Sequence, residues 1–226
     1  MIFTHFKLGF ILIIICGLIS LSGCMGTPPK NEWQLKAISD FNGYKIYYLE
    51  DKIGLAQHDL QRARELTKQG TDLKTLARLE LAQCAVQIGV LEATHCENYQ
   101  ILAALHQHAE LDAYFRFLQQ QTQRADIALL PSQYHQFATQ LLDGIASDQL
   151  EQTIVKIDSI ESRLIAAALV RDKLSTDFVR QLIKQTSFHG YKRASLQWMQ
   201  HLSKITPSTD EANRLQQMII LMKTAS

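Results

Sequence analysis

The chain has 226 residues, of which 46% are hydrophobic and 20% charged, with 23 Lys and Arg against 22 Asp and Glu. This size and hydrophobic content are sufficient for a globular core. Near neutrality excludes the excess of positive charge on which binding to nucleic acids and to anionic lipids depends. We therefore expect no nucleic-acid partner.

The first distinctive segment is the apolar run 8–21, which follows Lys7. The run has the length of a secretory signal, about 7–15 apolar residues, whereas a membrane-spanning helix needs about 20. It ends in Leu21-Ser22-Gly23-Cys24. This tetrapeptide resembles the lipobox of bacterial lipoprotein signal peptides, in which small residues precede the acceptor cysteine.

The resemblance implies that residues 1–23 are a signal peptide, cleaved before Cys24. It further implies a diacylglycerol on the Cys24 sulfur and an acyl chain on the new amine, and we expect no other cofactor. Two or three acyl chains hold a protein firmly on a membrane. Met25, in place of aspartate, resembles the sorting pattern for the outer membrane of enteric bacteria, which implies its periplasmic face. The alternatives are an uncleaved anchor extended through Gly26 and secretion without lipid.

The segment after the acceptor cysteine is predicted to be an extended tether. Pro28-Pro29 favours an extended backbone without internal hydrogen bonds. We therefore assign residues 24–32 to the lipidated cysteine and tether, and residues 33–226 to a single α-helical domain. Cleavage after residue 23 would remove one charged residue, Lys7, and leave 22 basic and 22 acidic residues in the mature protein.

In that domain apolar residues recur at intervals of three and four, the period of an amphipathic helix. The first stripe predicts one helix over 45–69, with Gly70 as its left-handed stop and Thr71 as a cap for the next helix. The second stripe predicts a helix over 72–90, with Glu80 at its solvent edge. Further helices are predicted at 97–107, 110–122, 132–143, 148–156, 159–171, 176–188, 191–205 and 209–223.

The predicted fold class is all-α, as an irregular α-solenoid or an antiparallel bundle of helix hairpins. The clearest hairpin spans residues 177–205 and turns at His189-Gly190. Through Ala194 and Trp198 this hairpin loosely resembles a tetratricopeptide unit, although the first-helix signature of that repeat is missing. We expect Trp198 in the core.

Two cysteines remain once the leader is removed and Cys24 is lipidated, namely Cys84 and Cys96. In a secreted chain such a pair predicts a disulfide. The alternatives are two separate buried thiols and a metal site that includes His95, His106 or His108. On a helix the last two histidines point in different directions, and His95 adjoins Cys96, so we predict no metal site.

Catalytic motifs are missing from the sequence: it contains no G-x-S-x-G, H-E-x-x-H, C-x-x-C or Gly-rich phosphate loop. Glu161-Ser162 resembles the Glu-Ser of lytic transglycosylases, in which the glutamate is the general acid. That family's downstream Gly-Leu-Met-Gln is absent, and Glu161 also suits a capping box that begins at Asp158. We therefore predict no catalytic residue.

Aromatic residues crowd two short segments and form the candidate interaction surface, because aromatic side chains are favoured at interfaces. The candidates are Tyr44, Tyr47, Tyr48, Tyr114 and Phe117. The alternative is packing of these rings between adjacent helices. The expected function is a membrane-tethered, non-enzymatic factor that binds another envelope protein or assists its assembly. The alternative is a peptidoglycan-processing enzyme that uses Glu161.

Overall fold

A computed structural model describes residues 31–224, which form helices and connecting turns without a strand among them. The all-α prediction is therefore confirmed. The α-helices are α2 (Glu32–Leu49), α3 (Ile53–Gln69), α4 (Leu73–Gly89), α5 (Glu97–Leu105), α6 (Ala109–Leu118), α7 (His135–Leu142), α8 (Ser147–Val155), α9 (Ile160–Leu169), α10 (Thr176–Phe188), α11 (Lys192–Ile205) and α12 (Thr209–Thr224). Short 3-10 helices are η2 (Arg124–Leu129), η3 (Ser132–Tyr134) and η4 (Arg171–Lys173).

The predicted signal peptide, Cys24 and nearly all of the tether lie outside the described residues. Within residues 31–224, no helix combines the length and the apolar character that a bilayer crossing requires. The lipobox prediction therefore stays a prediction.

The single helix predicted over 45–69 is wrong, because the chain reverses between α2 and α3. Asp51 adopts a left-handed conformation with φ of 69°, and the backbone N–H of Lys52 donates to the Tyr47 carbonyl over 2.8 Å. Each helix buries a stripe of apolar residues, and the spacing of three and four continues across the turn, so the sequence pattern does not show where α2 ends. The start of α2 was also missed, because its early apolar residues Leu35 and Ile38 are exposed.

The end of α3 differs from its prediction as well. Gly70 has a right-handed φ of −73°, and the left-handed residue is Thr71, with φ of 50°. The cap of α4 is Asp72, whose side chain accepts from the Thr75 backbone N–H. Glycine is required at position 70 because the Trp33 ring packs on it, and an added Cβ would lie 2.4 Å from that ring.

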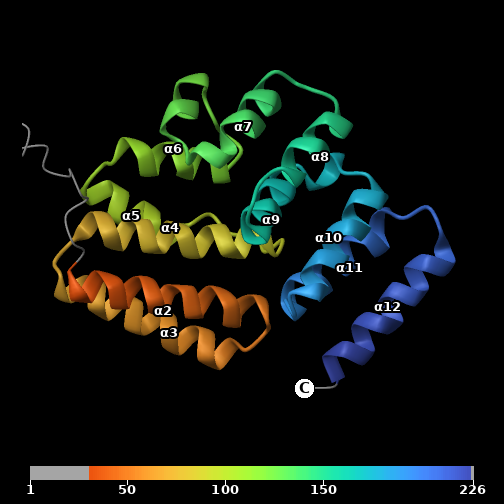
Figure 1. Ribbon diagram of the computed structural model, residues 1–226, viewed down its shortest axis with the longest axis horizontal. Coiled ribbons are helices and arrows are strands. Elements are labelled where there is room, and N and C mark those ends of the chain that lie inside the picture. Colours follow the sequence, from red (N-terminus) through yellow and green to blue (C-terminus); the bar gives the residue numbers. More distant parts are fainter. Residues whose placement is uncertain (1–30, 225–226) are drawn as a thin grey trace, which may run out of the picture. The chain divides into compact units, whose positions relative to one another are not determined.

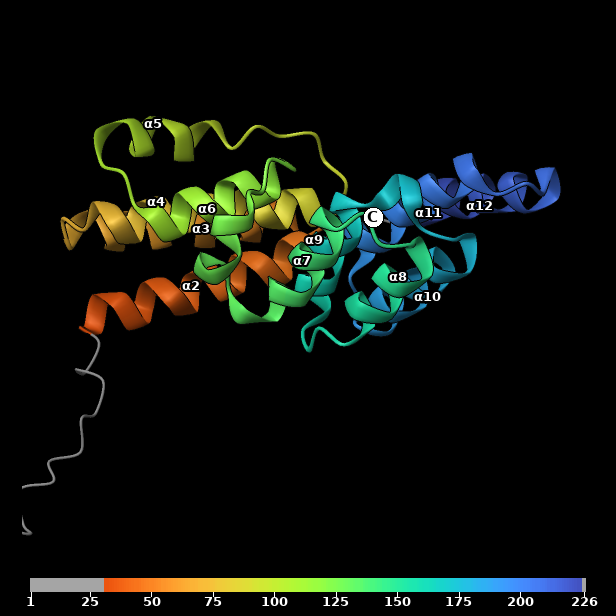
Figure 2. The same cartoon turned by 90° about the horizontal axis from the view of Figure 1, so that it is seen from above.

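Neighbouring helices pack as hairpins, most clearly α2 with α3, α10 with α11, and α11 with α12 (Figures 1 and 2). The domain also contains contacts between helices far apart in sequence, since α4 packs on α9 and α11 packs on α2. In an open solenoid each unit contacts only its neighbours. These two contacts therefore favour the bundle over the solenoid.

Trp198 on α11 links this packing to the middle of the chain. Its side chain is fully buried, as predicted, and its indole N–H donates to the Gly89 carbonyl at the end of α4 over 3.1 Å. The predicted turn of this hairpin is also confirmed, because Gly190 adopts a left-handed φ of 72°. The C-terminal hairpin is thus attached to α4 by a buried hydrogen bond.

The contact between Trp33 and Gly70 generates a stability prediction. Gly70→Ala should lower the free energy of unfolding by about 1–3 kcal/mol, because the added methyl displaces the indole. Gly54→Ala on α3 is the matched control, since nothing lies within 4 Å of its added Cβ. Its stability should stay unchanged or rise slightly. Chemical denaturation measures both, and an equal cost of Gly70→Ala in a Trp33→Ala background would contradict the contact.

Candidate functional site: a polar cleft beside the disulfide

A polar cleft of about 260 Å³ lies between α4 and the segment that leads into α5. One wall comes from a single face of α4, because residues spaced by three and four share a face of a helix. The opposite wall is the segment 92–98. The lining residues are Glu80, Gln83, Cys84 and Gln87 on α4, and Glu92, Ala93, Thr94, Cys96, Glu97 and Asn98 opposite.

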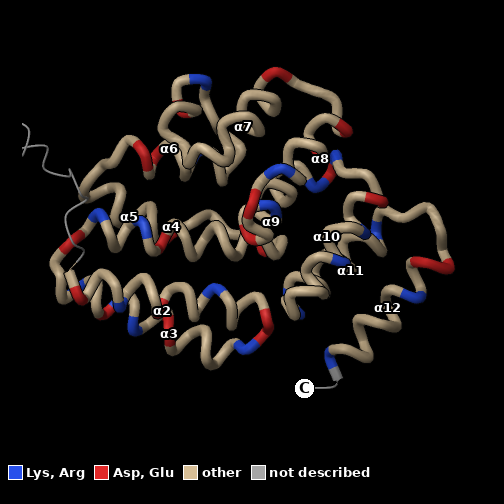
Figure 3. Tube along the Cα trace, viewed as in Figure 1, with Lys and Arg blue, Asp and Glu red and all other residues tan. Residues whose placement is uncertain are grey.

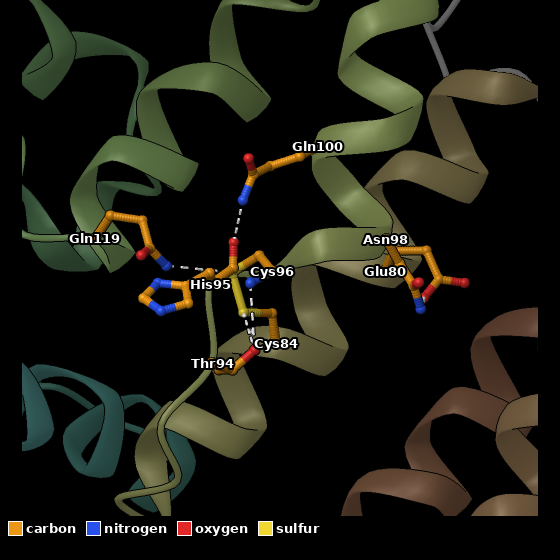
Figure 4. The surroundings of a disulfide bond; sticks show 8 residues. All are labelled: Glu80, Cys84, Thr94, His95, Cys96, Asn98, Gln100 and Gln119. Atoms are coloured by element: carbon orange, nitrogen blue, oxygen red, sulfur yellow. Dashed lines mark hydrogen bonds between the residues drawn. A yellow bond between two sulfur atoms is a disulfide. The ribbon is translucent and has the colours of Figure 1, made fainter.

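A disulfide joins the two walls. The sulfur atoms of Cys84 and Cys96 lie 1.99 Å apart and their Cα atoms 5.3 Å apart, as the sequence-based pairing requires (Figure 4). Both residues are buried. The Thr94 hydroxyl accepts a hydrogen bond from the backbone N–H of Cys96 over 3.2 Å, which fixes the chain beside the bridge.

The histidines considered as metal ligands lie elsewhere than expected. Because α5 ends at Leu105, His106 and His108 follow the helix and their rings stack with centroids 4.4 Å apart. The expectation that a helix separates them is therefore wrong. Within the described range 31–224, no three His, Cys, Asp or Glu side chains gather as a metal-binding group.

One end of the cleft contains a buried ion pair. Arg64 of α3 donates through Nε and Nη2 to the two carboxylate oxygens of Glu80, each over 2.6 Å. It also donates to Gln83 Oε1 over 2.7 Å, and the Asn98 amide donates to Glu80 over 3.1 Å. The predicted solvent exposure of Glu80 is wrong, since its side chain is only 6% exposed. Residues from both α3 and α5 cover this edge of α4.

A second ionic network lies at the other end. Arg193 of α11 donates to Glu92 Oε1 through Nε over 2.9 Å and through Nη2 over 2.5 Å. Its Nη1 donates to Asp51 over 3.0 Å, and the guanidinium lies 4.6 Å from the centre of the Tyr48 ring. Burial and the hydrogen bond to Glu92 raise the pKa of Tyr48 to about 12. Its hydroxyl therefore stays protonated and donates to Glu92 over 2.5 Å.

The structure does not place the predicted aromatic interaction surface at a surface. Tyr44, Tyr48 and Phe117 are buried, with 2%, 9% and 0% of their surface exposed. Tyr47 is half-buried beneath the Lys52 ammonium, and Tyr114 is half-buried in the wall of an apolar cleft next to α4. The rings pack between helices, as the alternative held. The ring centres of Phe117 on α6 and Phe137 on α7, for example, lie 6.1 Å apart.

No protein-family model matches the chain, and neither a curated protein nor a solved structure matches it.

Glu161 lies in a different cleft, of about 420 Å³, with Arg163, Gln185, His189 and Tyr191. The N-cap of α9 is Ser159, whose side chain accepts from the Ser162 backbone N–H, so the capping box predicted from Asp158 to Glu161 is wrong. Glu161 instead accepts a hydrogen bond from the Tyr191 hydroxyl over 2.8 Å. Burial alone would raise the pKa of Glu161, but hydrogen bonds from its own backbone N–H, Tyr191 and Ser159 lower it overall.

Several residues of the polar cleft were not identified from the sequence. Arg64, Gln83 and Gln87 occur on helices as ordinary polar residues, and nothing in their spacing marks them. Arg193 is 101 positions from Glu92 and 142 from Asp51, so no local pattern connects them. Only the cysteine pair gave a signal for this site.

The disulfide generates a stability prediction. The cysteines are 12 positions apart, and closing a loop of this size stabilises a fold by about 3 kcal/mol in the chain-entropy model. Reduction should therefore lower the melting temperature clearly while the helices persist at room temperature. Circular dichroism with and without reductant measures this, and Cys84→Ser/Cys96→Ser is the matched control that reductant should not affect. Two free thiols in protein isolated without reductant from its native compartment would contradict the bridge.

Proposed function

We propose that the chain is a lipoprotein of the bacterial cell envelope, lipid-anchored through Cys24 on the periplasmic face of the outer membrane. We further propose that it binds another protein there and catalyses no reaction. The observation that carries the proposal is the Cys84–Cys96 bridge. Structural disulfides persist in oxidising compartments, and this one uses the two cysteines that the lipobox and leader leave over.

Charge supports a protein partner over other classes. Acidic and basic residues interleave along the described chain (Figure 3), and many of them pair, as Arg116 does with Asp126 and Arg180 with Glu211. Binding to nucleic acid or anionic lipid needs an excess of unpaired positive charge. A partner that presents polar and hydrogen-bonding groups suits this surface better.

Lipidation is tested by Cys24→Ser. The variant should stay a full-length, unacylated precursor, because the lipid acceptor is gone. Cys16→Ser is the matched control, since Cys16 lies within the apolar run and its replacement should leave processing intact. Acyl labelling, gel mobility and membrane fractionation measure the outcome. Unchanged label and mobility in Cys24→Ser would contradict the anchor.

A peptidoglycan-processing enzyme is the second candidate, favoured by the cleft that contains Glu161. A general acid needs a raised pKa in order to be protonated near neutral pH, whereas hydrogen bonding lowers the pKa of Glu161. The carboxylate is therefore ionised, and Glu161 suits the structural contact with Tyr191 better than it suits acid catalysis.

We accordingly predict that the purified protein releases no soluble muropeptides from cell wall. Glu161→Gln should change the stability only slightly, because the Gln carbonyl still accepts from the Tyr191 hydroxyl. Muropeptide release by the wild type that disappears in an equally stable Glu161→Gln variant would establish the enzyme instead.

A further inference from the structure

The polar cleft beside the disulfide contains hydrogen-bonding groups that have no partner among residues 31–224. Gln83 accepts from Arg64 through its carbonyl oxygen, and within residues 31–224 its amide N–H groups have no hydrogen-bond partner. Asn98 donates its amide to Glu80, and in the described part of the chain its carbonyl oxygen accepts no hydrogen bond. Gln87 lines the same cleft, and its side chain forms no hydrogen bond within residues 31–224. The cleft therefore presents unused donors as well as unused acceptors.

The negative charges that line the cleft are not all paired with positive charges. Of its three carboxylates, those of Glu80 and Glu92 pair with Arg64 and Arg193. The third, Glu97, is exposed at the start of α5 and has no ion-pair partner in the described part of the chain. The cleft therefore has a net negative charge, which disfavours anionic ligands and favours cationic ones.

We infer that this cleft binds a short segment of the partner protein through its peptide groups, with a Lys or Arg side chain of that segment paired with Glu97. A peptide group has one N–H donor and one carbonyl acceptor, which match the carboxamides of Gln83, Gln87 and Asn98. The volume of about 260 Å³ is below the roughly 300–1,000 Å³ of pockets for drug-sized ligands. It accommodates one residue with its flanking peptide groups. That the ligand belongs to a protein rests on the proposed function.

Direct binding tests the ligand class. The acylated full protein, purified in detergent, is titrated against fluorescein-labelled, end-capped heptapeptides of Ala and Ser with Lys, Arg, Ala or Glu at the centre. Fluorescence anisotropy at low salt reports binding. The Lys and Arg peptides should bind, the Ala peptide should bind more weakly, and the Glu peptide should bind about tenfold more weakly than Lys or worse, because like charges repel.

Variants identify the residues. Glu97→Gln should lower the affinity for the Lys peptide about fivefold, which is the effect of losing one partly exposed ion pair. The affinity for the Ala peptide should stay unchanged. Asp148→Asn is the matched control, since Asp148 is an exposed acid in the first turn of α8, outside the cleft. Gln87→Leu should weaken the Lys, Arg and Ala peptides alike, because it removes a contact to the peptide backbone.

Equal binding of all four peptides, no measurable binding of any of them, or an equal loss in Asp148→Asn would overturn the inference. Its failure is distinct from failure of the proposed function. If Glu97→Gln and wild type capture the same partner equally by cross-linking in membranes, the proposed function is retained and binding in the cleft is rejected. If the protein binds the peptides but carries no lipid, binding in the cleft is retained and the proposed lipid-anchored function is rejected.

Discussion

The side chain of Arg193 forms the contacts on which the rest of the domain depends. It donates to Glu92, at the α4–α5 connection, and to Asp51, in the α2–α3 turn, while it covers the Tyr48 ring. One guanidinium therefore connects three segments that are far apart in sequence. Without it two partly buried carboxylates would lose their charge-assisted hydrogen bonds, which are individually worth about 1.5–3 kcal/mol.

Backbone conformation shows why that contact is needed. Asp51 and Leu91 both adopt left-handed conformations, with φ of 69° and 60°. A residue other than glycine in such a conformation costs on the order of 1–3 kcal/mol and persists only where its surroundings determine the conformation. One of these residues is itself a partner of Arg193, and the other directly precedes Glu92. The ion pairs thus hold two turns that local propensity alone would not select.

The same contact organises the candidate site. The segment 92–96 is held at one end by Arg193 through Glu92 and at the other by the disulfide through Cys96. Between these two points, the Thr94 hydroxyl accepts a hydrogen bond from the Cys96 backbone N–H. A wall held at both ends loses little conformational entropy when a ligand binds. The cleft is therefore preorganised even though its segment has no regular secondary structure.

Local signals in the sequence predicted the parts of this structure that depend on local chemistry. Apolar periodicity gave the helices from α4 onward, Gly190 gave a turn, and the cysteine count gave the bridge. The errors arose where tertiary contacts decide. Gly70 serves the Trp33 ring rather than a left-handed turn, and Glu80 is buried because Arg64 compensates its charge. Apolar periodicity also does not reveal the reversal between α2 and α3, because both helices bury an apolar stripe with the same spacing.

A membrane anchor would alter what the cleft has to achieve. A site of about 260 Å³, with a net negative charge and a few amides, supports only weak binding when both partners are free in solution. If residues 24–32 tether the domain to the membrane that holds its partner, the second contact becomes intramolecular in effect. Its effective concentration then reaches the millimolar range for a short flexible linker. Under the proposed function, weak recognition in the cleft and firm attachment through lipid would therefore be complementary parts of one mechanism.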